Sequence, residues 1–136
     1  MILFHSETKF QLKQKAKVKS WIKKAFAKEG KTIKDINFVF CDDRFLVEKN
    51  KTYLGHDALT DIITFDYSEG DLISGDIFIS VERVKENASI YNTPFLNELS
   101  RVIVHGVLHL LGYKDKSKKE KEIMREKEDF YLSLQT

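Results

Sequence analysis

The stretch from residue 94 to residue 111 constrains the fold of this chain most, because it is apolar on nearly every side. A helix with apolar residues all round is enclosed by the rest of a domain and does not lie on its surface. The residues concerned are Val102, Ile103, Val104, Val107, Leu108, Leu110 and Leu111. Thr93 fits the N-cap position and Pro94 the first helical position. We therefore expect a central buried helix.

Two histidines interrupt this stretch at a spacing that suits metal binding. His105 and His109 are four residues apart, so on a helix their imidazoles lie on the same side, one turn apart. Gly112 can end the helix in a left-handed turn that brings Asp115 back toward the same point. Two nitrogens and one carboxylate oxygen would leave a fourth position open, as in a catalytic zinc site. The alternative is that both histidines are core residues whose ring nitrogens bond to backbone or water.

The ligand set also indicates which ion and which reactions fit. Zinc suits two imidazoles and one carboxylate, and Ni²⁺ and Fe²⁺ accept similar ligands. Gly106 stands where a zinc peptidase carries the glutamate that acts as general base. Peptide hydrolysis by that mechanism is therefore disfavoured.

Three motifs give the chain a resemblance to a known family. Residues 105–115 read HGVLHLLGYKD, residues 60–65 read TDIITF and residues 74–80 read SGDIFIS. Together they resemble the YbeY family of bacterial rRNA maturation factors. The resemblance implies a single-domain, metal-dependent endoribonuclease that hydrolyses RNA phosphodiester bonds in 16S rRNA processing and ribosome quality control. It also implies rRNA and the ribosomal small subunit or assembly factors as partners, and neither DNA nor a membrane is expected.

Two stretches depart from the family pattern. The family most often has aspartate and then histidine after the tyrosine, whereas this chain has Lys114 and Asp115, so the third ligand would be a carboxylate. The family often has an arginine and a lysine around a glycine, whereas residues 54–57 of this chain read LGHD. A role assigned to that arginine cannot be carried over. Both departures predict a nuclease that is weak on its own.

Further side chains are candidates for catalysis. Arg101 and Glu98 precede the first histidine by one and two helical turns and share its face. Arg101 would stabilise phosphoryl charge, or the two residues would form a supporting ion pair behind the ligands. His56 would transfer protons near neutral pH, or be an uninvolved loop residue. The base that activates water is not identified by the sequence. Asp61 and Asp66 are candidates, although each is more simply explained as a hydrogen-bond acceptor at the end of a strand.

Positive charge gathers near the start of the chain. Residues 7–34 contain ten lysines against two glutamates, whereas the whole chain carries a net charge of only +2. Apolar residues recur at helical intervals from Leu12 to Phe26, and lysines fill the other face. Four of these lysines are candidate contacts to RNA phosphates: Lys13, Lys17, Lys24 and Lys28. The alternative is an ordinary solvated surface.

Strand-like and helical stretches alternate over the rest of the chain. Short strands are expected at residues 2–5, 36–40, 61–65 and 75–80, and helices at 42–54, 81–91 and 117–134. The last helix is inferred from Ile123, Phe130 and Leu134 at helical intervals. These elements predict an α+β fold, with a mixed sheet of about four strands packed against helices in one domain of residues 1–136.

The cysteine content and hydropathy bear on where the protein acts. Cys41 is the only cysteine in the sequence, which excludes an internal disulfide and fits a reducing cytoplasm. It closes an apolar run, so we expect a buried thiol. Neither a signal peptide nor a membrane span is visible.

Two other functions are compatible with the sequence. The chain could be a non-catalytic ribosome-assembly or RNA-binding factor with a structural metal. It could also be a metal-dependent hydrolase of another substrate. Loss of cleavage with retained RNA binding after replacement of His109 would favour the nuclease, whereas unfolding without metal would favour the structural role.

Overall fold

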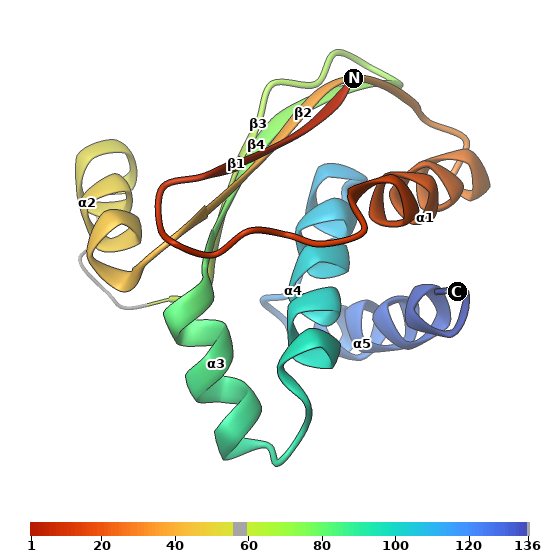
Figure 1. Ribbon diagram of the computed structural model, residues 1–136. Helices are drawn as coiled ribbons and strands as arrows, with labels where there is room; N and C mark the ends of the chain where they lie inside the picture. The colour runs from red at the N-terminus through yellow and green to blue at the C-terminus, as the bar shows by residue number, and fades with distance from the viewer. Residues whose placement is uncertain (56–59, 136) are drawn as a thin grey trace.

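The computed structural model describes residues 1–55 and 60–135, with four strands in one mixed sheet (Figure 1). The strands are β1 (Ile2–Ser6), β2 (Thr32–Cys41), β3 (Ile62–Asp66) and β4 (Leu72–Ser80), in the order β1-β2-β4-β3. β1 and β4 run parallel to β2, whereas β3 runs antiparallel to β4. The expected mixed sheet of an α+β fold is confirmed.

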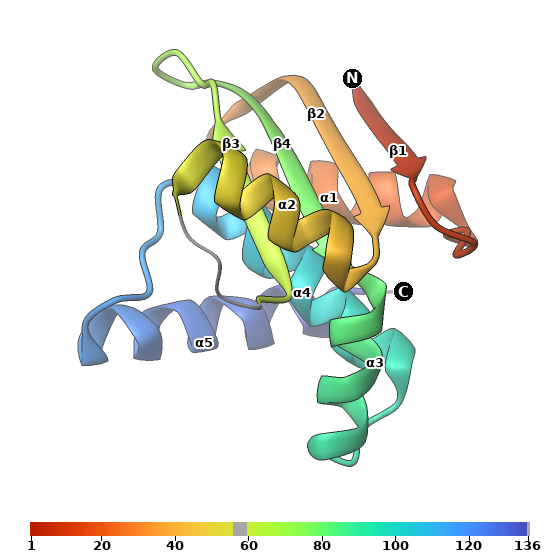
Figure 2. The ribbon, with the colours of Figure 1, turned by 90° about the vertical axis from the view of Figure 1, so that its left-hand side faces the viewer.

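Helices cover both faces of this sheet. They are α1 (Lys15–Lys28), α2 (Asp43–Leu54), α3 (Val81–Ile90), α4 (Phe95–Leu110) and α5 (Lys118–Ser133). Figure 1 shows α2 on one face and α1 and α4 on the other, and Figure 2 views the molecule from the α2 side. α5 packs against α4. No helix among the described residues has both the length and the apolar character needed to cross a membrane.

α4 is the central helix that the sequence predicts, and two glycines let it approach the sheet closely. A Cβ atom on Gly106 would lie 2.9 Å from Ile62 Cδ1 and 3.0 Å from Ile77 Cγ2. A Cβ atom on Gly75 of β4 would lie 2.6 Å from Leu110 Cδ2. Gly106 therefore packs so closely against the sheet that a larger residue would fit there only if the neighbouring side chains moved.

Two helix starts differ from the predictions by a few residues. Pro94 is itself the N-cap of α4, with extended dihedral angles of φ −60° and ψ 144°. The prediction of Thr93 as N-cap was therefore wrong. Gln14 adopts a left-handed conformation with φ 55° directly before α1, so Leu12 and Lys13 precede the helix and do not belong to it.

The second strand is longer than predicted. β2 begins at Thr32 and not at residue 36, because its first residues also pair with β4, beginning with Thr32 opposite Leu72. A shift of register between Ile33 and Asp35 interrupts this pairing. Charged residues interrupt this segment, so its apolar pattern did not predict the early part of the strand.

The predicted last helix is α5, and the residues it buries most deeply are not the apolar ones from which it was inferred. Ile123 and Phe130 are 37% and 46% exposed, whereas Met124, Glu128 and Tyr131 are buried. The Trp21 indole donates a hydrogen bond to the Tyr131 carbonyl at 2.7 Å, which holds this face of α5 toward α1. The rotation places the carboxylate of Glu128 against α4.

The prediction of a buried Cys41 is confirmed. Its side chain is fully buried in a small cluster with Leu46 and Ile63 beneath α2. The thiol donates to the Ile79 carbonyl at 3.4 Å. Burial, together with the nearby Asp42 and other carboxylates, raises the pKa of Cys41 to about 12, so the thiol stays protonated and unreactive at neutral pH.

Candidate metal centre

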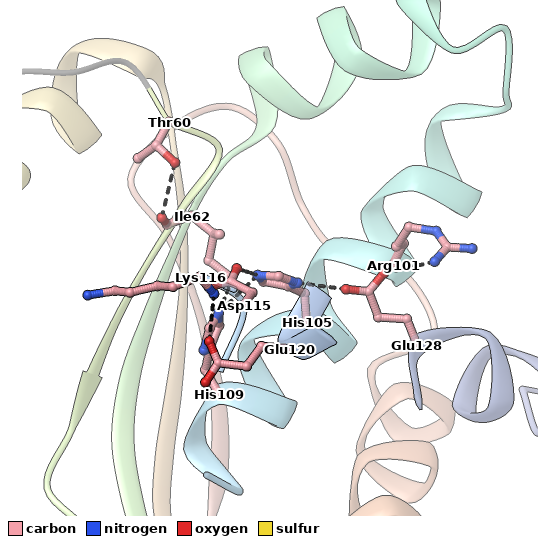
Figure 3. Close-up of polar contacts among 9 residues, drawn as sticks. All are labelled: Thr60, Ile62, Arg101, His105, His109, Asp115, Lys116, Glu120 and Glu128. Carbon is pink, nitrogen blue, oxygen red and sulfur yellow. Dashed lines mark hydrogen bonds and ion pairs between the residues drawn. The ribbon is translucent and has the colours of Figure 1, made fainter. Parts of the chain in front are cut away.

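Three ligand atoms converge beside the C-terminal end of α4, and we call His105, His109 and Asp115 the ligand triad (Figure 3). His109 Nε2 lies 3.0 Å from His105 Nε2 and 3.3 Å from Asp115 Oδ2. His105 Nε2 lies 3.2 Å from the same Asp115 oxygen. Ligand atoms about 2.0–2.1 Å from a tetrahedral zinc ion lie about 3.3 Å apart. The triad therefore has the spacing of three corners of a zinc tetrahedron.

A glycine turn brings Asp115 back toward the histidines, as the sequence predicts. Gly112 has φ +101°, a conformation that L side chains rarely adopt. Its N–H donates to the His109 carbonyl, and the Tyr113 N–H donates to the Leu108 carbonyl, both at 3.0 Å. This pair of hydrogen bonds is a Schellman motif. It reverses the chain directly after the second histidine.

The loop that carries Asp115 is held on both sides. Before it, the Tyr113 hydroxyl donates to Glu29 Oε1 at 2.6 Å and ties the loop to the end of α1. After it, the Lys116 N–H donates to Glu120 Oε1 at 3.2 Å (Figure 3), and the Ser117 N–H donates to the same oxygen at 2.9 Å. The second anchor belongs to a capping box at the start of α5. The Asp115 carboxylate, which is predicted to be the third ligand, is therefore preorganised by contacts of its loop to two helices.

A buried carboxylate fixes the orientation of His105. Nδ1 of His105 donates to Glu128 Oε2 at 2.6 Å, because an ionised carboxylate can only accept. Nε2 is thereby left to face His109 and Asp115. Burial alone would raise the pKa of Glu128, but hydrogen bonds from His105 and Arg101 outweigh it and lower this pKa. Glu128 therefore remains a charged acceptor.

Arg101 holds the other side of Glu128. Its guanidinium donates to Glu128 Oε1 at 2.8 Å (Figure 3) and to Asp129 Oδ1 at 2.7 Å. These contacts link Arg101 on α4 to Glu128 on α5 and, through Glu128, to His105 of the ligand triad. Burial alone would lower the pKa of His105, but Glu128, together with the charges of Asp115 and Asp61, raises it.

The donor set of the triad fits a borderline transition-metal ion. Two imidazole nitrogens and one carboxylate oxygen are typical of catalytic zinc sites, which keep one position for water or substrate. The hydrogen bond from His105 Nδ1 to a carboxylate is the arrangement that usually fixes a metal-binding imidazole. The residues of this site therefore fit the metal that the sequence predicts.

A cavity of about 960 Å³ opens beside the triad. Asn97, Arg101 and His105 line it from one face of α4, at intervals of one helical turn. Asp61, directly before β3, and Arg125 from α5 also contribute to the lining. Burial raises the pKa of Asp61 more than the charge of the nearby His105 lowers it.

The other predicted site residues lie in different surroundings. Glu98 is buried at 9% exposure and lines the same cavity. Asp66 is exposed, and its side chain accepts from the Ser68 N–H at 2.9 Å, as expected of a strand-end acceptor. His56 lies outside the described residues. The catalytic roles of Arg101 and His56 stay predictions.

Glu128 contacts the ligand triad and was not among the residues predicted from the sequence. It lies 23 residues after His105 on a charged helix with several other glutamates. The sequence alone therefore does not single it out. In the structure it lies four residues after Met124 and three before Tyr131, which share the buried face of α5.

Comparisons with known proteins identify a family model, sequences and a solved structure that are similar to this chain. The sequence model of the family described as Endoribonuclease YbeY matches residues 2–135. A protein named Endoribonuclease YbeY from Flavobacterium psychrophilum is 50% identical over 134 residues, which cover 98% of this chain and 96% of the relative. One of the same name from Cytophaga hutchinsonii is 49% identical over 98% of this chain and 94% of its own length. The solution structure of a Thermotoga maritima protein is similar with a TM-score of 0.69 and 30% identity, covering 98% of this chain and 87% of that one.

Proposed function

The chain belongs to the Endoribonuclease YbeY family, and from this premise we propose that it hydrolyses RNA phosphodiester bonds at a metal ion held by the ligand triad. The observation that carries the proposal is the spacing of 3.0 to 3.3 Å among the three ligand atoms. Such atoms leave one face of the ion for substrate or water. Residues 1–136 form the hydrolase domain in this proposal.

We propose zinc as the bound ion, with Ni²⁺ or Fe²⁺ as the alternatives. When bound, such an ion supplies Lewis-acid chemistry by polarising a phosphoryl oxygen and favouring loss of a proton from the attacking water. The protein itself orients His105 through Glu128 and fixes Asp115 through the anchored loop. Both contacts reduce the movement that His105 and Asp115 would need in order to bind the metal.

Arg101 is the candidate for stabilising charge on the phosphoryl group. Its side chain is 24% exposed and contributes to the cavity wall. The two carboxylates that it binds fix its position. His56 is the second catalytic candidate, as a group that transfers protons near neutral pH.

The candidate surface for the RNA backbone is the lysine face that α1 and the residues before it form together. Lys13, Lys17, Lys24 and Lys28 are all exposed. α1 lies on the same face of the sheet as α4 (Figure 1). Changing all four lysines to glutamate should weaken RNA binding and flatten its salt dependence without unfolding the protein. Unchanged affinity and salt slope would make this face an ordinary solvated surface.

The biological substrate in this proposal is rRNA. The role would be 16S rRNA processing and ribosome quality control in the cytoplasm, with the ribosomal small subunit or assembly factors as partners. DNA is not an expected substrate. A cleavage assay with purified ribosomal subunits and a matched DNA oligonucleotide tests both statements.

The deciding experiment combines metal analysis with cleavage and binding of RNA. We expect about one transition-metal ion per chain and loss of that ion in the His105→Ala/His109→Ala double variant. His109→Ala alone should abolish cleavage and keep RNA binding. Full metal content in the double variant would mean that the site is misplaced. Cleavage at the parental rate by His109→Ala would exclude the proposed mechanism.

A further inference from the structure

The carboxylate of Glu29 binds three side chains that come from distant parts of the chain. Glu29 is the C-cap of α1, where its N–H donates to the Ala25 carbonyl at 3.1 Å. Its carboxylate accepts from the Tyr113 hydroxyl at 2.6 Å, from Lys127 Nζ at 3.3 Å and from the Tyr131 hydroxyl. We call these four residues the Glu29 cluster. It joins α1 to α5 and to the loop that carries Asp115.

The Glu29 cluster is shielded from water and keeps its negative charge. The side chain of Glu29 is 15% exposed, and Tyr131 is buried. Burial alone would raise the pKa of Glu29, but hydrogen bonds from Tyr113, Tyr131 and Lys127 outweigh it and lower this pKa. Hydrogen bonds to an ionised acceptor are stronger than those between neutral groups. The cluster is therefore a firm attachment point inside the protein.

α5 holds the Glu29 carboxylate in one place. Lys127 and Tyr131 are four residues apart on this helix, so their side chains share one face. The Trp21 indole of α1 also donates to the Tyr131 carbonyl at 2.7 Å. Glu29 is thereby restrained by its own helix and by two side chains of α5. The Tyr113 hydroxyl consequently meets an acceptor whose position is already fixed.

The Asp115 loop needs such an attachment, because the ligand side chain itself is open to solvent. The Asp115 side chain is 37% exposed, so packing alone restrains it little. Its oxygen nevertheless lies 3.2 and 3.3 Å from the nitrogens of His105 and His109. A loop that becomes ordered only on binding subtracts the cost of ordering from the affinity. Tyr113 lies two residues before Asp115 and can order the loop in advance.

We propose that Glu29 is a positioning residue for the metal centre, which holds Asp115 in place through the Tyr113 hydroxyl. This inference rests on the proposed function, since it requires a metal ion at the ligand triad. Two buried carboxylates then support two different ligands. Glu128 orients His105 directly, whereas Glu29 restrains Asp115 through the loop.

A double-mutant cycle on the full chain tests this role. Zinc affinity is measured by competition with a chromophoric chelator for the parent, Tyr113→Phe, Asp115→Ala and the double variant. Tyr113→Phe should lower zinc affinity by about 3- to 10-fold. The same substitution should have no further effect in Asp115→Ala, because the hydroxyl acts only through Asp115. Tyr67→Phe is the matched control, since it removes a hydroxyl that donates to a different carboxylate, Asp76, at 3.4 Å, and it should bind zinc as the parent does.

Variants of Glu29 test the other end of the contact. Glu29→Ala should lower zinc affinity at least as much as Tyr113→Phe does. Glu29→Gln should retain part of the affinity, because its amide oxygen still accepts a hydrogen bond. Urea unfolding of the metal-free variants measures stability separately from zinc binding. A purely structural role would lower stability and leave zinc affinity unchanged, and if Glu29→Ala does not fold, the cycle with Tyr113→Phe still decides.

The outcomes distinguish this inference from the proposed function. Parental zinc affinity in Tyr113→Phe overturns the positioning role, and so does an equal loss in the Asp115→Ala background. If the parent binds no zinc, or if Asp115→Ala binds it as tightly as the parent, the ligand triad fails together with the positioning role. Zinc binding that requires Asp115 but does not respond to Tyr113→Phe overturns the positioning role alone.

Discussion

Glu128 of α5 accepts a hydrogen bond from Nδ1 of His105 on α4 at 2.6 Å, although the two residues are 23 positions apart. Glu128 is only 5% exposed, so the bond is shielded from water. It places the proton of the neutral imidazole on Nδ1 and leaves the Nε2 lone pair for the metal. The packing of α5 on α4 thus determines which ring nitrogen of His105 is available to bind the metal.

Replacing Glu128 should therefore weaken metal binding. We expect Glu128→Ala to lower zinc affinity by about 10- to 100-fold, and Glu128→Gln to lose less, because its amide oxygen still accepts from Nδ1. Nitrogen NMR of His105 should show a neutral form protonated at Nδ1 in the parent and a mixture in Glu128→Ala. Asp129→Ala is the control, since it removes the other carboxylate on Arg101 without contacting His105. Parental zinc affinity and an unchanged tautomer in Glu128→Ala would refute this role.

The ligand triad could be predicted from sequence because all its determinants are local. His105 and His109 are one turn apart on a helix, and Gly112 reverses the chain within three residues. Helix geometry and the conformational freedom of glycine decide this arrangement without help from distant parts of the fold. The same reasoning predicted Asp115, which lies only six residues after His109.

Glu128 could not be predicted in the same way, because its position depends on the rotation of α5. Ile123 and Phe130 gave the clearest apolar spacing, yet the packing of Tyr131 near Trp21 turns them outward. Hydrophobicity alone does not distinguish faces of a helix this rich in charge. The early part of β2 was missed for a related reason, since its pairing with β4, and not an apolar run, makes it a strand.

The third ligand should separate metal retention from catalytic pH dependence. Asp115→Ala should bind metal more weakly than the parent, because only two protein ligands remain. Asp115→His should retain metal and cleave RNA with a pH profile moved toward lower pH. A neutral third ligand leaves more positive charge on the ion than a carboxylate does. Metal content after dialysis and initial rates across a pH series measure both effects, and tight metal binding by Asp115→Ala would remove this residue from the triad.

Acid should destabilise the fold partly through Asp43, which lies at the start of α2. Its carboxylate accepts from Ser80 Oγ at 2.7 Å and from Arg83 at 2.9 Å. Although burial would raise the pKa of Asp43, these bonds lower it below its ordinary value. A carboxyl whose pKa is lower in the folded state stabilises the protein above its unfolded pKa of about 3.9. This contribution is lost as pH falls through the folded value.

Asp43→Asn should therefore reduce the free energy of unfolding by about 1–2 kcal/mol at pH 7. The difference between variant and parent should shrink below about pH 4. Urea unfolding at several pH values measures this change, and Glu122→Gln on the exposed side of α5 is the control. A difference that does not depend on pH would assign the effect of the substitution to packing and not to charge.

Arg101→Ala should lower turnover more than RNA affinity. The guanidinium lies in the wall of the cavity, and its bonds to Glu128 and Asp129 hold it in one position. A fixed cation that meets negative charge developing on the phosphoryl group contributes to the transition state more than to binding of the substrate. The loss of Arg101 also frees Glu128 to move, so the assay must be run at saturating zinc, where weaker metal binding does not limit the rate. Under those conditions we expect kcat to fall by roughly 10- to 100-fold with a smaller change in KM.

Arg101→Lys should recover part of the loss, because it retains the charge but not the two-pronged contact to Glu128 and Asp129. Cleavage by Arg101→Ala at the parental kcat would leave Arg101 with the single role of supporting Glu128.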